Sequence, residues 1–265
     1  MARTRVTVLT VSHDTMALTA LLLWSLRRVL DVPAHVSLDV LVVDNGSTDG
    51  SRELLSGLAA AGACRLLTND RNIGHGPALN QGLASLRTGG APPQWAWILD
   101  SDCVIARPDA LAGALRAAEA SGRGDTSVCV GEPQWDRWHG MERFELYSLL
   151  VDPTAIAGVH FAADGDPAFP VLEHLRQLGA PTAPFAFAAG AFVVHRGRGT
   201  LAAVVANEER DNPLYEWAVD HNLAHFGGVA GAAERYASLE SRFRAEVPEL
   251  DAEPLASVLT RRSDR

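Results

Sequence analysis

The sequence predicts an α/β fold, in which a mostly parallel central sheet is flanked by helices and followed by a helical C-terminal extension. Over the first 120 residues, short runs of apolar and β-branched residues alternate with longer segments of helical apolar spacing. That alternation is typical of a doubly wound parallel sheet. Beyond residue 125 the alternation loosens, and the last segments have helical spacing. No internal repeat or low-complexity linker divides the 265 residues, so we expect one unit with its extension.

Four strands and four helices are expected in the first 120 residues. Arg5 begins a β-branched run that indicates the first strand, and the helix after it ends before Pro33. Ser47 is the expected N-cap of the second helix. The strands are predicted over 5–12, 38–43, 65–68 and 95–99, and the helices over 15–30, 51–61, 77–86 and 108–120.

The second part of the chain is less regular. Strands are predicted over 127–130 and 185–194, and helices over 167–178, 214–226 and 232–245. We therefore divide the chain into a domain over 1–205, with halves 1–105 and 106–205, and a helical C-terminal extension over 206–265.

Composition and charge exclude several classes of function. Hydrophobic residues make up 47% of the chain, enough for a large core, and the net charge of −9 argues against a nucleic-acid or anionic-membrane partner. No apolar run approaches the roughly 18–20 residues of a membrane-spanning helix. The chain enters its first strand within a few residues, so no signal peptide is expected. The three cysteines lack metal-type spacing, which favours a cytoplasmic protein with free thiols.

Three aspartates end predicted strands. Asp44 follows an apolar run, and Asp100 and Asp102 follow another in an Asp-Ser-Asp sequence. Open α/β sheets bind ligands at the carboxyl ends of their strands. Two carboxylates on one loop suit a divalent cation that also touches substrate phosphates. The pattern predicts an enzyme with a nucleotide-activated, diphosphate-bearing substrate; the alternative is that these carboxylates only cap turns.

Four motifs occur in a definite order along the chain. They are Val-Leu-Thr-Val-Ser-His-Asp over 8–14, Val-Asp-Asn-Gly-Ser-Thr-Asp-Gly-Ser over 43–51, Asn-Asp-Arg-Asn-Ile-Gly-His-Gly-Pro-Ala-Leu-Asn-Gln-Gly over 69–82, and Asp-Ser-Asp over 100–102. Together they resemble the pattern of glycosyltransferase family 2 on a GT-A fold. The resemblance covers residues 5–105 well and residues 125–200 more loosely.

The resemblance implies a Rossmann-like GT-A fold and an inverting transfer of a sugar from a nucleotide-diphosphate donor, with Mn²⁺ or Mg²⁺ as cofactor. UDP or TDP is the expected carrier, and the acceptor is a small molecule, a lipid-linked molecule or a peptide. By resemblance, Asp44 accepts a hydrogen bond from the base or ribose, and Asp102 holds the metal against the diphosphate, with Asp100 acting through water or the ribose and belonging also to the nucleotide-sugar site. The other residues that the resemblance assigns to the nucleotide-sugar site are Thr10, Val11, Ser12, His13, Asn72, Gly74, Asn80 and Ser101.

An inverting transfer also needs a carboxylate that takes the proton from the acceptor. The family places an acidic doublet at the start of a helix, and the matching stretch here is Asp164-Gly165-Asp166-Pro167. This departs from the family pattern because one residue separates the acids. Asp166 is the first candidate base and Asp164 the second, with helix capping as the alternative role.

A histidine after a late strand is a further metal ligand in many members of the family. His195 matches this position, and His225 is the rival candidate. Arg196 and Arg198 follow in a glycine-rich loop, and guanidinium groups bind diphosphate oxygens bidentately.

An aromatic stretch supplies candidates for contact with the acceptor. Trp135 and Trp138 lie in Gln-Trp-Asp-Arg-Trp, which is similar to a motif of processive membrane synthases but stands before the candidate base, so we interpret it as coincidence. Flat apolar rings bind sugars and aromatic acceptors, although these rings equally suit the edge of a core. His139 and Glu142 lie nearby and are further candidates.

Other classes of function fit the residues less well. A nucleotidylyltransferase or a dinucleotide-dependent dehydrogenase needs a glycine-rich loop after the first strand, and this chain has none there. A non-catalytic homologue that binds a nucleotide-sugar or a partner protein remains the alternative, because of the irregular acidic doublet. The C-terminal helices predict a homodimer.

Overall fold

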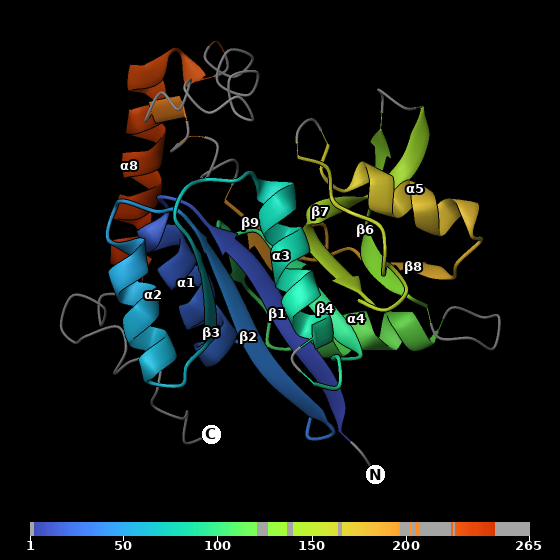
Figure 1. The fold of residues 1–265 in the computed structure, drawn as a ribbon. Helices are drawn as coiled ribbons and strands as arrows, with labels where there is room; N and C mark the ends of the chain where they lie inside the picture. The colour runs from blue at the N-terminus through green and yellow to red at the C-terminus, as the bar shows by residue number, and fades with distance from the viewer. Residues whose placement is uncertain are drawn as a thin grey trace.

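The computed structural model describes residues 3–88, 90–120, 127–136, 140–163, 166–196, 202, 205–206, 224 and 226–246. A seven-stranded sheet in the order β3-β2-β1-β4-β7-β6-β8 forms its centre, with helices on both faces (Figure 1). A second sheet has two strands, β5 and β9. The predicted α/β class with a mostly parallel sheet is confirmed.

The N-terminal half of the large sheet is parallel. Neighbouring strands β3, β2, β1 and β4 all pair in the same direction, and the register aligns Ser12 with Asp44. The carboxyl ends of β1 and β2 therefore meet at one edge of the sheet. The bounds of the four strands are β1 Thr4–Ser12, β2 Val36–Asn45, β3 Arg65–Asn69 and β4 Trp95–Leu99.

Helices cover the two faces of the sheet and bury two separate cores. Side chains of α1 (Met16–Arg28), α2 (Ser51–Ala60) and α4 (Ala110–Glu119) pack with one face. Side chains of α3 (His75–Thr88) and α5 (Phe169–Gln177) pack with the other. This is the doubly wound arrangement that the alternating sequence predicts. The predicted N-cap is wrong: Gly50, with φ 93°, precedes α2, and Ser47 instead accepts a hydrogen bond from the Asp14 amide.

A hairpin joins the second half to the first. β7 (Met141–Val151) runs antiparallel to β4 and to β6 (Cys129–Asp136), and β8 (Thr182–Pro184) lies beside β6 in parallel. The sequence predicts only a short strand over 127–130 in this region. Polar residues along 132–145 interrupt the apolar pattern that would indicate longer strands, and β7 forms because it pairs with strands far away in the sequence.

The predicted buried strand over 185–194 is wrong for most of its length. Only β9 (Val193–His195) is extended, and it pairs antiparallel with β5 (Cys103–Ile105). Phe185 contacts the rings of Phe187 and Phe192, and the chain between them turns. The three phenylalanines pack together as a compact cluster in which Phe187 is buried, and they do not form a strand.

One helix of the C-terminal extension is described. α8 (Val229–Glu246) confirms the helix predicted over 232–245 and packs against α1 (Figure 1). The predicted helix over 214–226 lies outside the described residues, except for positions 224 and 226, which are helical. In the described part of the chain, every helix is too short or too polar to cross a bilayer.

Candidate metal and nucleotide site

The Asp-Ser-Asp turn joins β4 to β5 at the carboxyl edge of the sheet. β5 pairs with β9 in a register that sets Cys103 opposite His195, and this brings the imidazole to the turn. His195 Nε2 lies 3.1 Å from Asp102 Oδ1 and 3.8 Å from Asp100 Oδ2. One ligand atom from each of Asp100, Asp102 and His195 lies within 4.8 Å of the others. The structure therefore gathers the two predicted acidic residues and the favoured histidine into one cluster.

The chemistry of this cluster fits a divalent cation. Two carboxylates and an imidazole are ligands that suit Mn²⁺, and oxygen ligands suit Mg²⁺. Asp100 Oδ1 is shielded from solvent and makes no hydrogen bond within the described residues, although His75 Nε2 lies 3.5 Å from it. A buried carboxylate oxygen without a hydrogen bond is costly unless a cation or a proton compensates it. The three side chains thus form a candidate metal centre.

Electrostatics within the cluster favour positive charge. Burial raises the pKa of Asp100, and the nearby Asp102 adds to the shift while His75 and His195 oppose it. Burial opposes a charge on His195, but Asp102, helped by Asp100 and Glu145, outweighs it and raises the pKa of the imidazole to about 9. A bound cation would compensate the negative charge of the two carboxylates in place of the proton on the imidazole.

Tyr147 on β7 fixes the orientation of the histidine ring. Its ring stacks on His195 with centroids 5.0 Å apart and planes 6° apart. The Tyr147 hydroxyl donates to Glu132, whose other oxygen accepts the Ala189 amide at 3.0 Å. Ligating histidines generally need such an outer support. The sequence analysis missed Tyr147 and Glu132, because no local pattern marks a contact between β7 and β9.

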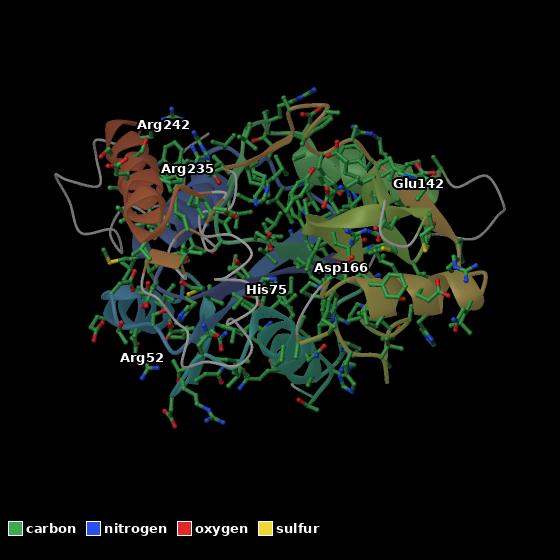
Figure 2. The ribbon with its side chains drawn as sticks, turned by 90° about the horizontal axis from the view of Figure 1, so that it is seen from above. Arg52, His75, Glu142, Asp166, Arg235 and Arg242 are labelled. Atoms are coloured by element: carbon green, nitrogen blue, oxygen red, sulfur yellow. The ribbon has the colours of Figure 1, made fainter. Side chains whose placement is uncertain are left out.

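His75 is a second functional candidate that the sequence analysis missed. It begins α3, and its Nε2 lies 3.5 Å from Asp100 Oδ1. Figure 2 labels this side chain together with Asp166, which lies ahead of α5. A histidine directly after Gly74 of the predicted nucleotide loop was the signal that could have revealed it.

Asp44 is held by its own protein neighbours. The side chain is fully buried, and its oxygens accept hydrogen bonds from Arg52 Nε at 3.0 Å and from the Ser47 amide at 3.3 Å. Arg52 also donates to the Asn69 carbonyl oxygen. In this structure Asp44 and Arg52 shape the acidic turn, with the guanidinium beside it at the molecular surface (Figure 2).

The predicted residues at the end of β1 lie next to this turn. Thr10, Val11, Ser12 and His13 are all buried. Ser12 Oγ is 2.9 Å from Thr19 Oγ1, and Thr15 Oγ1 is 3.3 Å from the hydroxyl of Ser101 in the metal turn. Ser12, Thr15 and Thr19 thus form a chain of hydroxyl groups that links the end of β1 to the candidate metal centre.

Asn45 holds the glycine-and-asparagine loop against β2. Its Nδ2 donates to Asn72 Oδ1 at 2.7 Å and to the Gly74 carbonyl at 3.2 Å, while its Oδ1 accepts from Asn69 and Ile73. The loop that contains the predicted Asn72 and Gly74 is therefore anchored at the sheet edge.

Asn80 clamps a different segment. Its amide donates to the Phe161 carbonyl at 2.9 Å and accepts from the Phe161 amide at 2.8 Å. These two bonds join α3 to the segment that leads to Asp166, so this side chain positions the chain near the site.

Asp166, the first candidate base, has a partner on each oxygen. Its Oδ2 forms an ion pair with Arg143, and its Oδ1 accepts the Ala168 amide at 3.3 Å ahead of α5. Arg143 also pairs with Asp136 at 3.0 Å. The bond to the Ala168 amide precedes the helix, and Asp166 does not cap α5, because Ala168 is its N-cap residue and no side-chain cap hydrogen bond is formed there.

The acceptor candidates separate in the structure. Trp135 is 61% exposed, and its strand position pairs with Glu142 across the hairpin. Glu142 lines a groove of about 530 Å³ between the hairpin and α5, and Trp135 is not among the groove's lining residues. Four sequence candidates, Asp164, Arg198, Trp138 and His139, lie outside the described residues, as does the rival ligand His225.

Helix α8 reaches the metal turn through the backbone of Arg196. The Arg196 amide donates to the Asp102 carbonyl at 2.9 Å, and its own carbonyl accepts from Arg235 of α8 at 3.0 Å. Figure 2 labels Arg235 and Arg242 on this helix. The extension is therefore connected to the site.

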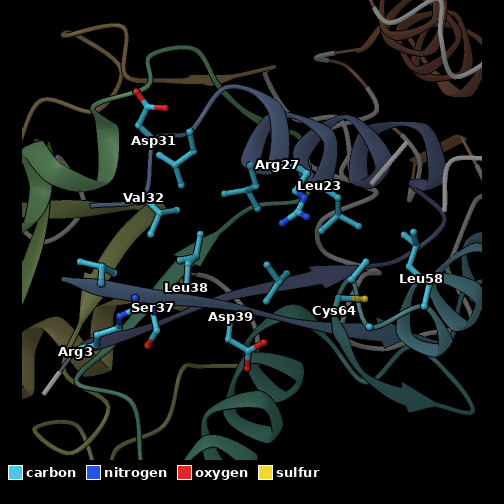
Figure 3. A pocket seen from close by; sticks show the side chains of 17 residues that line it. Arg3, Leu23, Arg27, Asp31, Val32, Ser37, Leu38, Asp39, Leu58 and Cys64 are labelled. Carbon is cyan, nitrogen blue, oxygen red and sulfur yellow. The ribbon is translucent and has the colours of Figure 1, made fainter. Parts of the chain in front are cut away.

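The larger cavity lies elsewhere. A groove of about 700 Å³ runs between α1, β2 and the end of α2, where Leu23, Leu58 and Asp39 line it (Figure 3). None of the predicted site residues lines it. Chemistry rather than volume therefore locates the candidate site.

The sheet order and the acidic cluster at its carboxyl edge define a GT-A type of α/β protein. The chain belongs to glycosyl transferase family 2, whose family model matches residues 12–164. No match to a curated protein was found.

Solved structures with the same fold are similar over most of the chain. The mannosyltransferase PcManGT from Pyrobaculum calidifontis, in complex with GDP-Man and Mn²⁺, has a TM-score of 0.52 and 18% identity, over 98% of this chain and 86% of that one. S. aureus TarS 1-349 in complex with UDP has a TM-score of 0.53 and 15% identity, over 94% of this chain and 75% of that one. GalNAc-T7 with UDP, GalNAc and Mn²⁺ has a TM-score of 0.51 and 13% identity, over 68% of this chain and 42% of that one.

Proposed function

We propose that this protein is a metal-dependent, inverting glycosyltransferase that moves a sugar from a nucleotide-diphosphate donor to a hydroxyl or similar nucleophile. The observation that carries the proposal is the cluster of Asp100, Asp102 and His195 at the carboxyl edge of the sheet, in a chain of glycosyl transferase family 2. Similar structures bind GDP-Man with Mn²⁺ or UDP, which supports a nucleoside diphosphate as the leaving group.

The two halves of the domain have separate tasks in this proposal. Residues 1–105 bind the nucleotide, with Asp44 and the loop of Asn72 and Gly74 around the base and ribose. Asp100, Asp102 and His195 hold Mn²⁺ or Mg²⁺. The cation neutralises charge on the diphosphate leaving group, which is the Lewis-acid role. UDP and TDP are the expected carriers, and Arg196 and Arg198 are placed in sequence to bind diphosphate oxygens.

Residues 106–205 bind the acceptor. The groove between the hairpin and α5 supports this assignment, because it opens beside Arg143 and Glu142. Trp135 offers an exposed ring at the same hairpin. The sequence predicts Asp166 or Asp164 as the base, and the acceptor is a small molecule, a lipid-linked molecule or a peptide. The extension over 206–265 is proposed to complete the site through α8, and the predicted homodimer is tested by light scattering.

A non-catalytic homologue is the second candidate function. The ion pair of Asp166 with Arg143 favours it, because the carboxylate that the family would use as a base already has a partner on each oxygen. Such a protein would bind a nucleotide-sugar and release no sugar from it. Turnover of any nucleotide-sugar by the wild type excludes this candidate.

The first test measures metal-dependent binding of nucleotides. Thermal midpoints are recorded with UDP, TDP, GDP, CDP and ADP, each with and without Mn²⁺. A ligand at 100 times its Kd stabilises the folded state by about 2.7 kcal/mol. We expect one nucleotide to raise the midpoint of the wild type only when Mn²⁺ is present.

Two variants make the test specific to the cluster. Asp102→Asn removes a buried ligand and should abolish the shift. The control Asp39→Asn changes an exposed residue of β2 that forms an ion pair with Arg65, and this variant should show the same thermal shift as the wild type. No shift with any nucleotide, or an undiminished shift in Asp102→Asn, contradicts the proposed site.

A further inference from the structure

Strands β6 and β7 lose their regular pairing opposite Glu132. The register jumps between Gly131 and Pro133 of β6, so that residues 145–148 of β7 stand opposite Glu132 alone. A bulge of this kind turns side chains away from the regular alternation and is common next to active sites. The hydroxyl of Tyr147, which lies in the irregular part of β7, donates a hydrogen bond to the Glu132 carboxylate. The break in the ladder is therefore joined by a specific contact between these two side chains.

The Glu132 carboxylate also holds the turn that leads into β9. Its two oxygens accept hydrogen bonds from the backbone amides of Ala188 and Ala189. The same turn contains Ala191, whose φ of 52° is one of two positive values at non-glycine positions in the described part of the chain. This backbone conformation is costly for alanine and persists where neighbouring groups hold it. Because β9 begins two residues later and ends at His195, Glu132 fixes the path of the chain towards this histidine.

Tyr147 contacts two of the three candidate metal ligands. Its ring stacks on the imidazole of His195, and its backbone carbonyl accepts a hydrogen bond from the Asp100 amide at 3.0 Å. Tyr147 is 8% exposed and belongs to the core beneath the sheet, so its ring cannot move away without opening that core. Glu132 therefore supports His195 by two routes, one through the ring of Tyr147 and one through the turn before β9.

We propose that Glu132 is a positioning residue of the metal centre, which sets the affinity for Mn²⁺ through Tyr147 and through the turn before β9. The inference rests on the proposed function, because it assumes that Asp100, Asp102 and His195 bind a cation. Groups that orient a ligating histidine typically change the metal affinity 10–100-fold when they are removed. The Glu132 carboxylate is engaged with the Tyr147 hydroxyl and two backbone amides, so it acts on the cation through His195.

The experiment measures Mn²⁺ binding by the electron paramagnetic resonance signal of the free ion, with Mn²⁺ alone and with UDP or GDP present. Glu132→Gln keeps the shape of the side chain but turns one acceptor oxygen into an amide nitrogen. Tyr147→Phe keeps the stacked ring without its hydroxyl, and Tyr147→Leu removes the ring. The matched control is Glu119→Gln, which changes an exposed residue at the end of α4. Thermal midpoints without metal show that each variant is folded, and the visible absorption of bound Co²⁺ reports the geometry of its ligands.

We expect Glu132→Gln and Tyr147→Leu to bind Mn²⁺ about 10-fold or more weakly than the wild type, and the Co²⁺ spectrum of both to change. Tyr147→Phe should lose about 3–10-fold, because it removes one hydrogen bond and keeps the stacked ring. The double variant Glu132→Gln/Tyr147→Phe should lose less than the product of the two single losses, since the hydroxyl and the carboxylate form one contact. Glu119→Gln should match the wild type.

Two outcomes overturn the inference. One is an Mn²⁺ affinity of Glu132→Gln within about threefold of the wild type. The other is a double variant whose loss equals the product of the single losses, because the two side chains would then act separately. A wild type that binds Mn²⁺ but releases no nucleoside diphosphate from a nucleotide-sugar contradicts the proposed transferase activity and not the inference. A wild type that binds no Mn²⁺, alone or with UDP or GDP, overturns both.

Discussion

The same substitution at two helical glycines should change stability in opposite directions. Gly76 lies in the first turn of α3, and a Cβ added there would stand 1.8 Å from the Ala162 carbonyl oxygen and 2.7 Å from its carbon. Gly57 lies on the exposed side of α2, and a Cβ there would have nothing within 4 Å. Gly57→Ala is therefore a matched control for Gly76→Ala.

The magnitudes follow from two opposing effects. Replacing glycine by alanine inside a helix gains about 0.5–1 kcal/mol. Overpacking costs about 1–3 kcal/mol, and a backbone carbonyl cannot rotate away as a flexible side chain can. The two Asn80 bonds that hold Phe161 to α3 would stretch as the segment moves, at about 1 kcal/mol each. We expect Gly57→Ala to gain about 0.5–1 kcal/mol and Gly76→Ala to lose about 1–3 kcal/mol.

Urea unfolding followed by circular dichroism measures both changes, and thermal midpoints provide a second reading at about 2–4 °C per kcal/mol for a chain of this size. Gly76→Ala should also weaken Mn²⁺-dependent nucleotide binding, because α3 begins with His75 beside Asp100. If Gly76→Ala is as stable as the wild type or more so, the close approach of α3 to Ala162 is not a constraint, and the reasoning is refuted.

Three further predictions test the core and the site. Asn45→Ala removes four hydrogen bonds of a buried side chain and should lower the free energy of unfolding in urea by about 2–4 kcal/mol; a loss below about 0.5 kcal/mol would show that the loop does not depend on it. Burial raises the folded-state pKa of Glu145, so the wild type loses stability as the pH rises above the unfolded pKa near 4.3. Glu145→Gln should therefore be more stable than the wild type at pH 7, and the two proteins should be equally stable below about pH 4. An opposite order in pH-dependent unfolding would contradict the stated burial. Burial raises the pKa of all three thiols, so a disulfide reagent at pH 8 should react with none in the native protein and with all in denaturant; the three are Cys64, Cys103 and Cys129.

Local sequence patterns predicted the parallel half of the fold well. Each of the first four strands and four helices is present, with bounds that differ by a few residues. Apolar runs and helical spacing are local properties, and a parallel sheet buried on both faces leaves them undisturbed. The second half was predicted less well, because β6 and β7 carry polar residues towards the site and the aromatic run over 185–192 turns back on itself.

The sequence by itself determined the fold class, the family and the acidic pair Asp100 and Asp102 at a strand end. These depend on short-range order along the chain. Only the tertiary structure decided which distant side chains join the pair. Antiparallel pairing of β5 with β9 brings His195 to Asp102, and the position of β7 brings Tyr147 against that histidine. It also gave Asp166 its arginine partner, Arg143. Contacts between segments far apart in sequence arise from packing, and no local period of the sequence records them.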